Sequence, residues 1–321
     1  MNGNKQDILV SIAITTYNGE LYLEEQLDSI FNQTFKNIEV VVSDDCSTDD
    51  TLKILKRYHH KYGLMYSINN TNIGVLKNFE KVINECKGHY IFLSDQDDVW
   101  FEDKIEIFIK EIGDFSMIYS DGYLMQDRNK TQNKISEEKW IKPFGLDSNN
   151  PSFYKYLIFK SFILGCSLMF KKDLLETTLP FKNLSRNHDW WLAICAEFKD
   201  GIKYYNKPLF YYRIHSKNYS LQPSISKIEY ILNFFTAKRK NQRMYGDENL
   251  VKVLNTLNSF KTDSIEKYNY IKKALRYISM NKNNKNTLES SIFIFNNMKY
   301  ISPSNNVLTR LLKIFRKLVI K

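Results

Sequence analysis

An acidic cluster in the first third of the chain has the residue types that bind a cation. Asp95, Asp97 and Asp98, with Gln96 between the first two, directly follow a short hydrophobic segment. Crowded carboxylates at such a place are costly unless a positive charge compensates them. Mg²⁺ or Mn²⁺ is typically held by one or two carboxylates, with water and substrate phosphates completing the octahedron. The cluster therefore predicts a divalent-cation site for a phosphate-bearing ligand; the alternative is an acidic turn that caps the next helix.

A second pair of carboxylates, Asp44 and Asp45, precedes a helix-capping sequence in which Thr48 is the expected N-cap. Capping explains residues 47–49 but not two carboxylates before them. A carboxylate at this point could accept the N3–H of a pyrimidine base, and the turn at 15–18 could offer backbone groups to the same ring. Base binding and helix capping both stay open.

A third candidate is the sequence His188-Asp189-Trp190-Trp191, in which one carboxylate stands beside two large aromatic residues. A general base must lie within hydrogen-bond reach of the hydroxyl that it deprotonates, and partial burial would raise the pKa of Asp189 toward the operating range. The tryptophan rings could stack on a sugar. Alternatively, they are core residues of a helix that runs to Phe198.

Arg213 and His215 lie on the same face of an expected extended segment about two dozen residues further along. Either side chain could contact a diphosphate, and a neutral His215 could be a further metal ligand. A surface pair without a ligand is the alternative.

The elements that must position these residues alternate between short apolar runs and amphipathic segments, which indicates βαβ units around a mostly parallel sheet. Strands are expected at 8–15, 38–43, 65–68, 89–93 and 117–119, and helices at 22–31, from 49, at 75–86 and from about 102. Each polar motif follows a strand. Ligands of such sheets bind beyond the carboxyl ends of the strands, so the motifs should converge there.

Missing motifs exclude several common enzyme classes. No two of the 11 glycines are closer than nine residues, so the chain has neither a dinucleotide-binding glycine loop nor a P-loop. It also has no G-x-S-x-G, H-E-x-x-H or kinase signature. Phosphate recognition must then come from metal and side chains.

The 4 cysteines form no C-x-x-C pair, which fits a reducing, cytoplasmic setting without a structural zinc site or a disulfide framework. No stretch approaches the roughly 18 consecutive apolar residues of a membrane span, and the first apolar run lacks the flanks of a signal peptide. We expect a protein that is not exported.

Charge separates the last third of the chain from the rest. Residues 221–321 hold 19 Lys+Arg and 6 Asp+Glu, and residues 1–220 hold 27 and 30, which together give the net +10. We expect a domain at 1–222, with halves at 1–113 and 114–222, and a basic helical region at 223–321. Residues 307–321 form a basic amphipathic segment that could lie on an anionic membrane or pack on the protein itself.

Four ordered segments carry a resemblance to a known family: VSIAITTYNGELYLEEQLDSIFNQTF, VVSDDCSTDDT, NTNIGVLKNFEKVI and GHYIFLSDQDDVW. They resemble the N-terminal half of family 2 glycosyltransferases with the GT-A fold, and SDQDDVW resembles bacterial rhamnosyltransferase-like members. The match is dense from residue 9 to about 113 and sparser to about 219, through HDWW and YYRIH.

The resemblance implies an inverting transfer of a sugar from a UDP- or dTDP-sugar to a hydroxyl of a saccharide or lipid-linked glycan acceptor in cell-surface polysaccharide synthesis. It implies Mn²⁺ or Mg²⁺ as cofactor, and Asp97, with Asp98 as the alternative, as the metal-contacting acid. His188 stands where the family usually has an acid. By position, the resemblance implies base contacts for Thr15, Tyr17 and Asp45, donor contacts for Lys77 and Asn78, a D-x-D site formed by Asp95 and Asp97, and Asp189 as the catalytic base. We also expect Asn18, Asp44 and Arg213 to bind the donor, and His188, Trp190 and Trp191 to lie on the acceptor side.

Two other functions compete with this one. A sugar nucleotidyltransferase would ordinarily show a glycine-rich basic loop after the first strand, which TTYNGELYL lacks. A nucleic-acid-binding protein is suggested only by the basic C-terminal third. We expect a cytoplasmic enzyme with peripheral contact to the inner face of the membrane through residues 307–321.

Overall fold

The computed structural model describes residues 8–127, 133–139, 152–159, 163–181, 187–215, 254–257, 264–282 and 297. The chain divides into two compact units, the first formed by residues 1–153, 161–182 and 186–217, and the second by 154–160, 183–185 and 218–321. All candidate site residues belong to the first unit. The domain boundary near residue 223 and the amphipathic segment at 307–321 lie outside the described residues and stay predictions.

The described residues of the first unit contain one nine-stranded sheet. Its strands are β1 (Val10–Thr16), β2 (Ile38–Asp44), β3 (Met65–Ile68), β4 (Tyr90–Ser94), β5 (Val99–Trp100), β6 (Met117–Asp127), β7 (Asn133–Lys139), β8 (Leu168–Lys171) and β9 (Ile202–Ile214). The strand order is β3-β2-β1-β4-β8-β6-β9-β5, and β7 pairs with β6.

The sheet is parallel only in part. Strands β3, β2, β1 and β4 are parallel neighbours, as βαβ units require. Beyond β4, strand β8 is antiparallel to both β4 and β6, β5 is antiparallel to β9, and only β6 and β9 run parallel. The expectation of a mostly parallel sheet therefore holds for β3, β2, β1 and β4 and for the β6–β9 pair, whereas β5, β7 and β8 are antiparallel to their neighbours.

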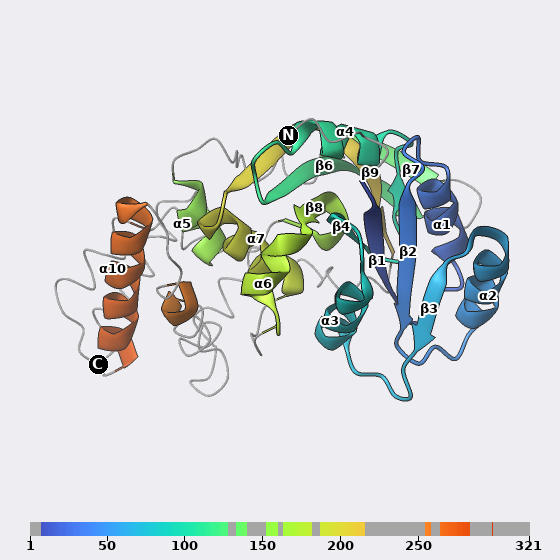
Figure 1. The fold of residues 1–321 in the computed structure, drawn as a ribbon, viewed down its shortest axis with the longest axis horizontal. Helices are drawn as coiled ribbons and strands as arrows, with labels where there is room; N and C mark the ends of the chain where they lie inside the picture. The colour runs from blue at the N-terminus through green and yellow to red at the C-terminus, as the bar shows by residue number, and fades with distance from the viewer. Residues whose placement is uncertain are drawn as a thin grey trace, which may run out of the picture. The chain divides into compact units, whose positions relative to one another are not determined.

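Helices cover both faces of the parallel strands. The helices are α1 (Leu23–Phe31), α2 (Thr51–Tyr62), α3 (Val75–Glu85), α4 (Lys104–Glu111), α5 (Phe153–Phe159), α6 (Leu175–Thr178), α7 (His188–Phe198) and α10 (Ile265–Lys282). Figure 1 shows α3 on one side of β1–β3 and α1 and α2 on the other. In α1 the buried residues Leu23, Gln26, Leu27 and Ile30 follow helical spacing, which directs one face to the sheet.

The start of α2 differs from the expected one. Thr51 is the first helical residue. Its backbone N–H donates to the Asp49 carboxylate at 3.0 Å, and its hydroxyl donates to the same carboxylate. Thr48 is therefore not the cap, because its own N–H donates to Asn18 Oδ1 in the preceding turn. The helix ends at Gly63, whose φ of 76° is the left-handed conformation that favours glycine.

In the second unit, α10 is part of the basic C-terminal region. Its Glu266 accepts hydrogen bonds from the Tyr154 hydroxyl at 3.0 Å and from Lys155 Nζ at 3.2 Å. Tyr154 also meets Tyr270 edge to face, at 5.5 Å between ring centroids. Among the described residues of the chain, no helix has the length and apolar character of a membrane span.

Candidate functional site

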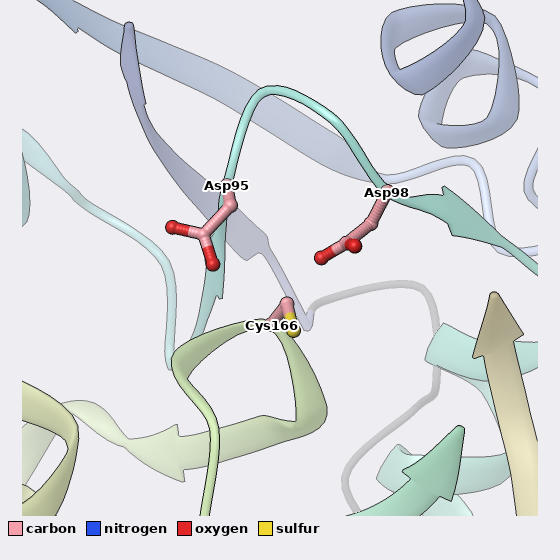
Figure 2. Close-up of side chains that lie close together, drawn as sticks. All are labelled: Asp95, Asp98 and Cys166. Atoms are coloured by element: carbon pink, nitrogen blue, oxygen red, sulfur yellow. The ribbon is translucent and has the colours of Figure 1, made fainter. Parts of the chain in front are cut away.

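The acidic loop, residues 95–98, follows the carboxyl end of β4, and its three carboxylates differ in burial and in hydrogen-bond partners. Asp95, Asp98 and the Cys166 thiol have atoms within 4.8 Å of one another (Figure 2). Burial raises the pKa of Asp95 well above its usual value, and the charges of Asp97, Asp98 and Asp189 raise it further. The pKa of the Cys166 thiol is raised mainly by burial, so it stays protonated and is a poor ligand for a hard cation.

Asp97 and Asp98 point to different partners. Asp98 is buried, its Oδ1 accepts from the Arg213 backbone N–H at 3.1 Å, and its carboxylate also accepts from the Cys166 thiol. Burial is the main reason that its pKa rises to about 7. Asp97, which is less buried, has its Oδ2 2.8 Å from His215 Nε2. The predicted metal set is thus divided: Asp97 and His215 meet, whereas Asp98 faces the interior.

Arg213 supports the acidic loop from β9. Its Nε donates to the Asp97 carbonyl at 2.8 Å, and its guanidinium forms an ion pair with Glu25 at 2.5 Å and lies over the Tyr22 ring. The side chain is 2% exposed. Its charge is paired with Glu25, whose side chain is 49% exposed, and the contact of Arg213 with the donor diphosphate stays a prediction. Arg213 is a support for the loop that carries Asp97.

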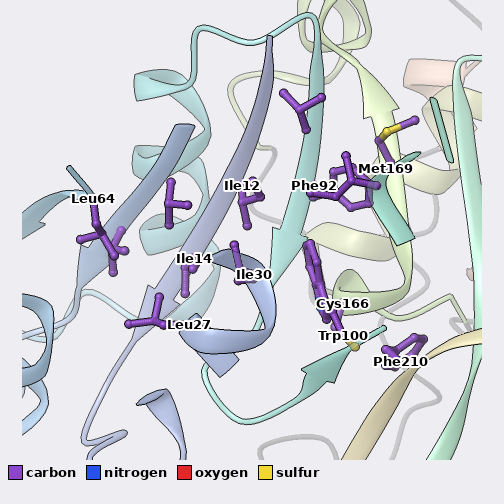
Figure 3. Close-up of a cluster of buried hydrophobic side chains, with 14 of the residues drawn as sticks. Ile12, Ile14, Leu27, Ile30, Leu64, Phe92, Trp100, Cys166, Met169 and Phe210 are labelled. Carbon is purple, nitrogen blue, oxygen red and sulfur yellow. The ribbon is translucent and has the colours of Figure 1, made fainter. Parts of the chain in front are cut away.

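A buried lysine, which the sequence did not single out, lies behind the acidic loop. Lys104 is 0% exposed and donates to the Cys166 carbonyl at 2.6 Å, and its Nζ lies 3.8 Å from the Trp100 ring centroid and 4.8 Å from that of Phe210. Figure 3 shows Trp100, Cys166 and Phe210 in the surrounding cluster of buried side chains. Burial lowers the pKa of Lys104 to about 7. Its position four residues before Phe108 on the buried face of α4 is the signal that could have revealed it.

Asp189 lies in the first turn of α7 and is buried. Its carboxylate accepts from the Trp190 N–H at 2.6 Å and from the Gly165 N–H, but burial dominates and raises its pKa to about 7. The charge of Asp189 also raises the pKa of Asp95. A carboxylate that changes protonation near neutral pH has the property that a general base needs.

The neighbours of Asp189 belong to the core. Trp190 and Trp191 are 2% and 1% exposed, and the Trp191 indole N–H donates to the Thr178 carbonyl at 3.0 Å. Both rings are buried as core residues of α7, and their contact with an acceptor sugar stays a prediction. His188 stacks on Phe79 at 3.9 Å, and burial lowers its pKa to about 3, so the imidazole is neutral. Its acceptor-side role stays a prediction.

Two of the residues predicted to contact the donor make hydrogen bonds within the protein. Asp44 is 0% exposed and accepts hydrogen bonds from the Thr16 hydroxyl at 2.7 Å and from the N–H and hydroxyl of Ser47 at 2.8 and 2.6 Å. Asn78 is also buried, and its amide donates to the Ser43 carbonyl at 2.8 Å. These hydrogen bonds join the ends of β1, β2 and α3, and the donor roles of both residues stay predictions.

Asp45 differs from Asp44 because it supports the loop before α3. Its Oδ1 accepts from the Ile73 N–H at 2.8 Å and from Asn69 Nδ2 at 2.9 Å, and its Oδ2 accepts from the Gly74 N–H at 2.9 Å. A carboxylate has about four acceptor positions. Three of these positions are filled within the protein, which leaves one on Oδ2, and the residue is 4% exposed.

The turn after β1 reaches the surface. Tyr17 is 49% exposed, and Thr15 is partly buried at the end of the strand. Asn18 has a φ of 49°, and its Oδ1 accepts from the Thr48 N–H at 2.9 Å, so this turn is tied to the one after β2. Lys77 is exposed on α3. The carboxyl ends of β1, β2 and β4 thus bring Tyr17, Asp45 and the acidic loop to one edge of the sheet, as the sequence predicts.

The sheet, with its helices and the acidic loop at the carboxyl end of β4, defines a glycosyltransferase of the GT-A class. The S. aureus TarS fragment 1-349, solved in complex with UDP-GlcNAc, has this fold with a TM-score of 0.58 and 18% identity; the match covers 92% of this chain and 82% of that one. The family model "Glycosyl transferase family 2" matches residues 11–177, and the chain therefore belongs to this family. The resemblance noted in the sequence and the GT-A fold are both confirmed.

Two curated relatives extend beyond that segment. The chain is 30% identical over 221 residues to the dTDP-rhamnosyl transferase RfbG of Shigella flexneri, covering 64% of this chain and 72% of the relative. It is 29% identical over 217 residues to WfaP of Escherichia coli, a UDP-Glc:alpha-D-GlcNAc-diphosphoundecaprenol beta-1,3-glucosyltransferase, covering 66% and 80%. The chain is therefore a family 2 glycosyltransferase with relatives that use nucleotide sugars.

Proposed function

We propose that this glycosyltransferase moves a sugar from a UDP- or dTDP-sugar to a hydroxyl of a saccharide or lipid-linked glycan, with inversion and with a divalent cation held by Asp97 and His215. The observation that carries the proposal is the 2.8 Å contact between Asp97 and His215 at the rim of the acidic loop. Both side chains retain some exposure, at 15% and 11%, unlike the other supports of the loop.

The residues at the loop fit a hard divalent cation. An oxygen and an imidazole nitrogen lie together, and three carboxylates crowd into four residues. Burial, and then the charges of Asp97, Asp98 and Asp189, raise the pKa of Asp95. A bound Mn²⁺ or Mg²⁺ would stabilise the charge that develops on the departing diphosphate. Arg213 holds the loop through the Asp97 carbonyl, and Lys104 holds the neighbouring turn through the Cys166 carbonyl.

The nucleotide base is proposed to bind between Tyr17 and Asp45. The open acceptor position on Asp45 can take the N3–H that uracil and thymine share, and the exposed Tyr17 ring can pack on the base. TarS was solved with UDP-GlcNAc, and RfbG is named for dTDP-rhamnose transfer, which supports a pyrimidine nucleotide.

Asp189 is proposed to be the general base. It deprotonates the attacking acceptor hydroxyl, and the Gly165 and Trp190 N–H groups orient its carboxylate for this task. WfaP acts on a diphosphoundecaprenol-linked sugar, which supports a lipid-linked acceptor for this chain as well.

The first test is the binding of nucleotide sugars, read by thermal shift. We expect UDP- or dTDP-sugars with Mn²⁺ or Mg²⁺ to raise the unfolding temperature, because a ligand that binds only the folded state stabilises it, and GDP-sugars to have less effect. Asp97→Ala should abolish the metal-dependent part of the shift, whereas Asp114→Ala, which removes an exposed acid outside the site, should retain it. A shift that does not depend on metal in the wild type contradicts the proposed cation site.

A further inference from the structure

Gln96, the residue between the first two acids of the loop, binds the backbone of the turn after β1 at two points. The Tyr17 N–H donates to Gln96 Oε1 at 2.9 Å, and Gln96 Nε2 donates to the Tyr17 carbonyl at 3.1 Å. Both polar atoms of the amide are thus used on one residue. Only a side chain with a donor and an acceptor side by side can make this pair of bonds.

Gly19 leaves the space that this amide occupies. A Cβ atom added to Gly19 would lie 2.3 Å from Gln96 Oε1 and 2.6 Å from its Cδ. Any side chain at residue 19 must therefore displace the amide from Tyr17. Gly19 does not have a positive φ, so an alanine there costs nothing through backbone strain. Tyr17, Gly19 and Gln96 therefore depend on one another, because the amide that bonds Tyr17 needs the space that Gly19 leaves.

We propose that Gln96 is a positioning residue that couples the nucleobase end of the donor pocket to its metal end. The inference rests on the proposed function, in which Tyr17 contacts the base and Asp97 the cation. Tyr17 is 49% exposed, so its ring has little packing of its own and relies on its backbone for its position. Asp97 follows Gln96 directly in the loop. Movement of the acidic loop on cation binding is transmitted to Tyr17 through the two hydrogen bonds.

The proposed coupling predicts weaker nucleotide binding without weaker cation binding, which a packing role of Gln96 does not predict. Loss of the amide should weaken the binding of a nucleotide that spans both ends, yet leave the cation's own ligands in place, because Asp97 and His215 contact each other without Gln96. Two neutral hydrogen bonds at a partly exposed site correspond to roughly a tenfold change in affinity. The same loss should follow from Gln96→Ala and from Gly19→Ala.

A double-mutant cycle tests this inference, with UDP and dTDP as probes in the presence of Mn²⁺ and isothermal titration calorimetry as the measurement. We expect each single variant to bind the nucleotide roughly tenfold more weakly, and Gly19→Ala to add nothing once Gln96 is alanine. Mn²⁺ alone should bind all four proteins equally. Gln96→Glu, which retains the acceptor but cannot donate to the Tyr17 carbonyl, serves as a second variant if Gln96→Ala does not fold.

The outcomes separate the two proposals. Additive losses in the cycle, or nucleotide binding unchanged in Gln96→Ala and Gln96→Glu, overturn the coupling while the proposed function stands. Weaker binding of Mn²⁺ alone in Gln96→Ala also overturns it, since the residue would then support the metal site only. A wild-type protein that binds neither UDP nor dTDP overturns the proposed function and the coupling together.

Discussion

The Asp189 carboxylate shows how one residue can serve the proposed reaction at a cost in stability. Burial raises its pKa from 3.8 to about 7, so the folded protein holds the proton more tightly than the unfolded chain does. The ionised form, which a general base requires, is the form that burial disfavours. The contribution of Asp189 to stability should therefore fall as pH rises from about 4 to about 7.

Asp189→Asn separates these two effects. We expect turnover to fall by roughly 100-fold or more, while the free energy of unfolding of the variant, relative to the wild type, increases by a few kcal/mol between pH 4 and pH 8. Wild-type turnover should rise with pH through about 7 as the base loses its proton. Urea denaturation and initial rates across this range measure both. Wild-type rates in the variant would rule out Asp189 as the base.

At the scale of elements, α4 and β9 supply the two buried cations, Lys104 and Arg213, that hold the acidic loop and the turn beside it. Lys104 of α4 joins the turn at Gly165–Ser167, whose Gly165 N–H contacts Asp189, and Arg213 of β9 joins the loop itself. The loop, the base and the metal ligands are thus held by elements far from one another in sequence. Rigid elements of this kind position a site more accurately than loops alone.

Lys104→Met tests the support from α4. The variant fills a similar volume but leaves the buried Cys166 carbonyl without its partner, which should cost about 1–3 kcal/mol of unfolding free energy. Lys53→Met, on the exposed surface of α2, is the matched control and should leave the urea midpoint unchanged. Equal midpoints for the two variants at pH 7 would show that Lys104 does not support the fold.

The whole molecule is divided by charge. The last 101 residues carry 19 basic and 6 acidic groups, and the remaining 220 carry a small acidic excess. A basic segment attracts an anionic surface at about 1 kcal/mol per basic residue close to it. The acceptor proposed for this chain is lipid-linked, so contact with a membrane would bring the enzyme to its substrate.

Liposome flotation tests the membrane contact proposed for residues 307–321. We expect the full chain to float with vesicles that contain anionic lipid, and less so at high salt because the attraction is screened. A version that ends near Pro303 should remain in the dense fraction. Equal flotation of the two proteins would contradict the contact, and zwitterionic vesicles provide the control for apolar binding.

The sequence by itself determined the fold class, the family and the strand ends at which polar residues gather. These properties depend on local order: apolar periodicity predicts the strands and helices of the first 113 residues to within a few positions, and parallel strands bring their carboxyl ends to one edge. The cluster at Asp95–Asp98 was predicted from its place after a strand, and the burial of Asp189 from the two tryptophans that follow it.

Only the tertiary structure decided which of these side chains are bonded to or enclosed by the rest of the protein. Arg213 meets Glu25 across 188 positions and His215 meets Asp97 across 118, and no local pattern indicates either pairing. Asp44, Asn78, Trp190 and Trp191 have the residue types of a binding site but are occupied or enclosed by neighbours. A hydrogen bond or a burial depends on every segment that packs around the group, and the fold alone specifies those segments.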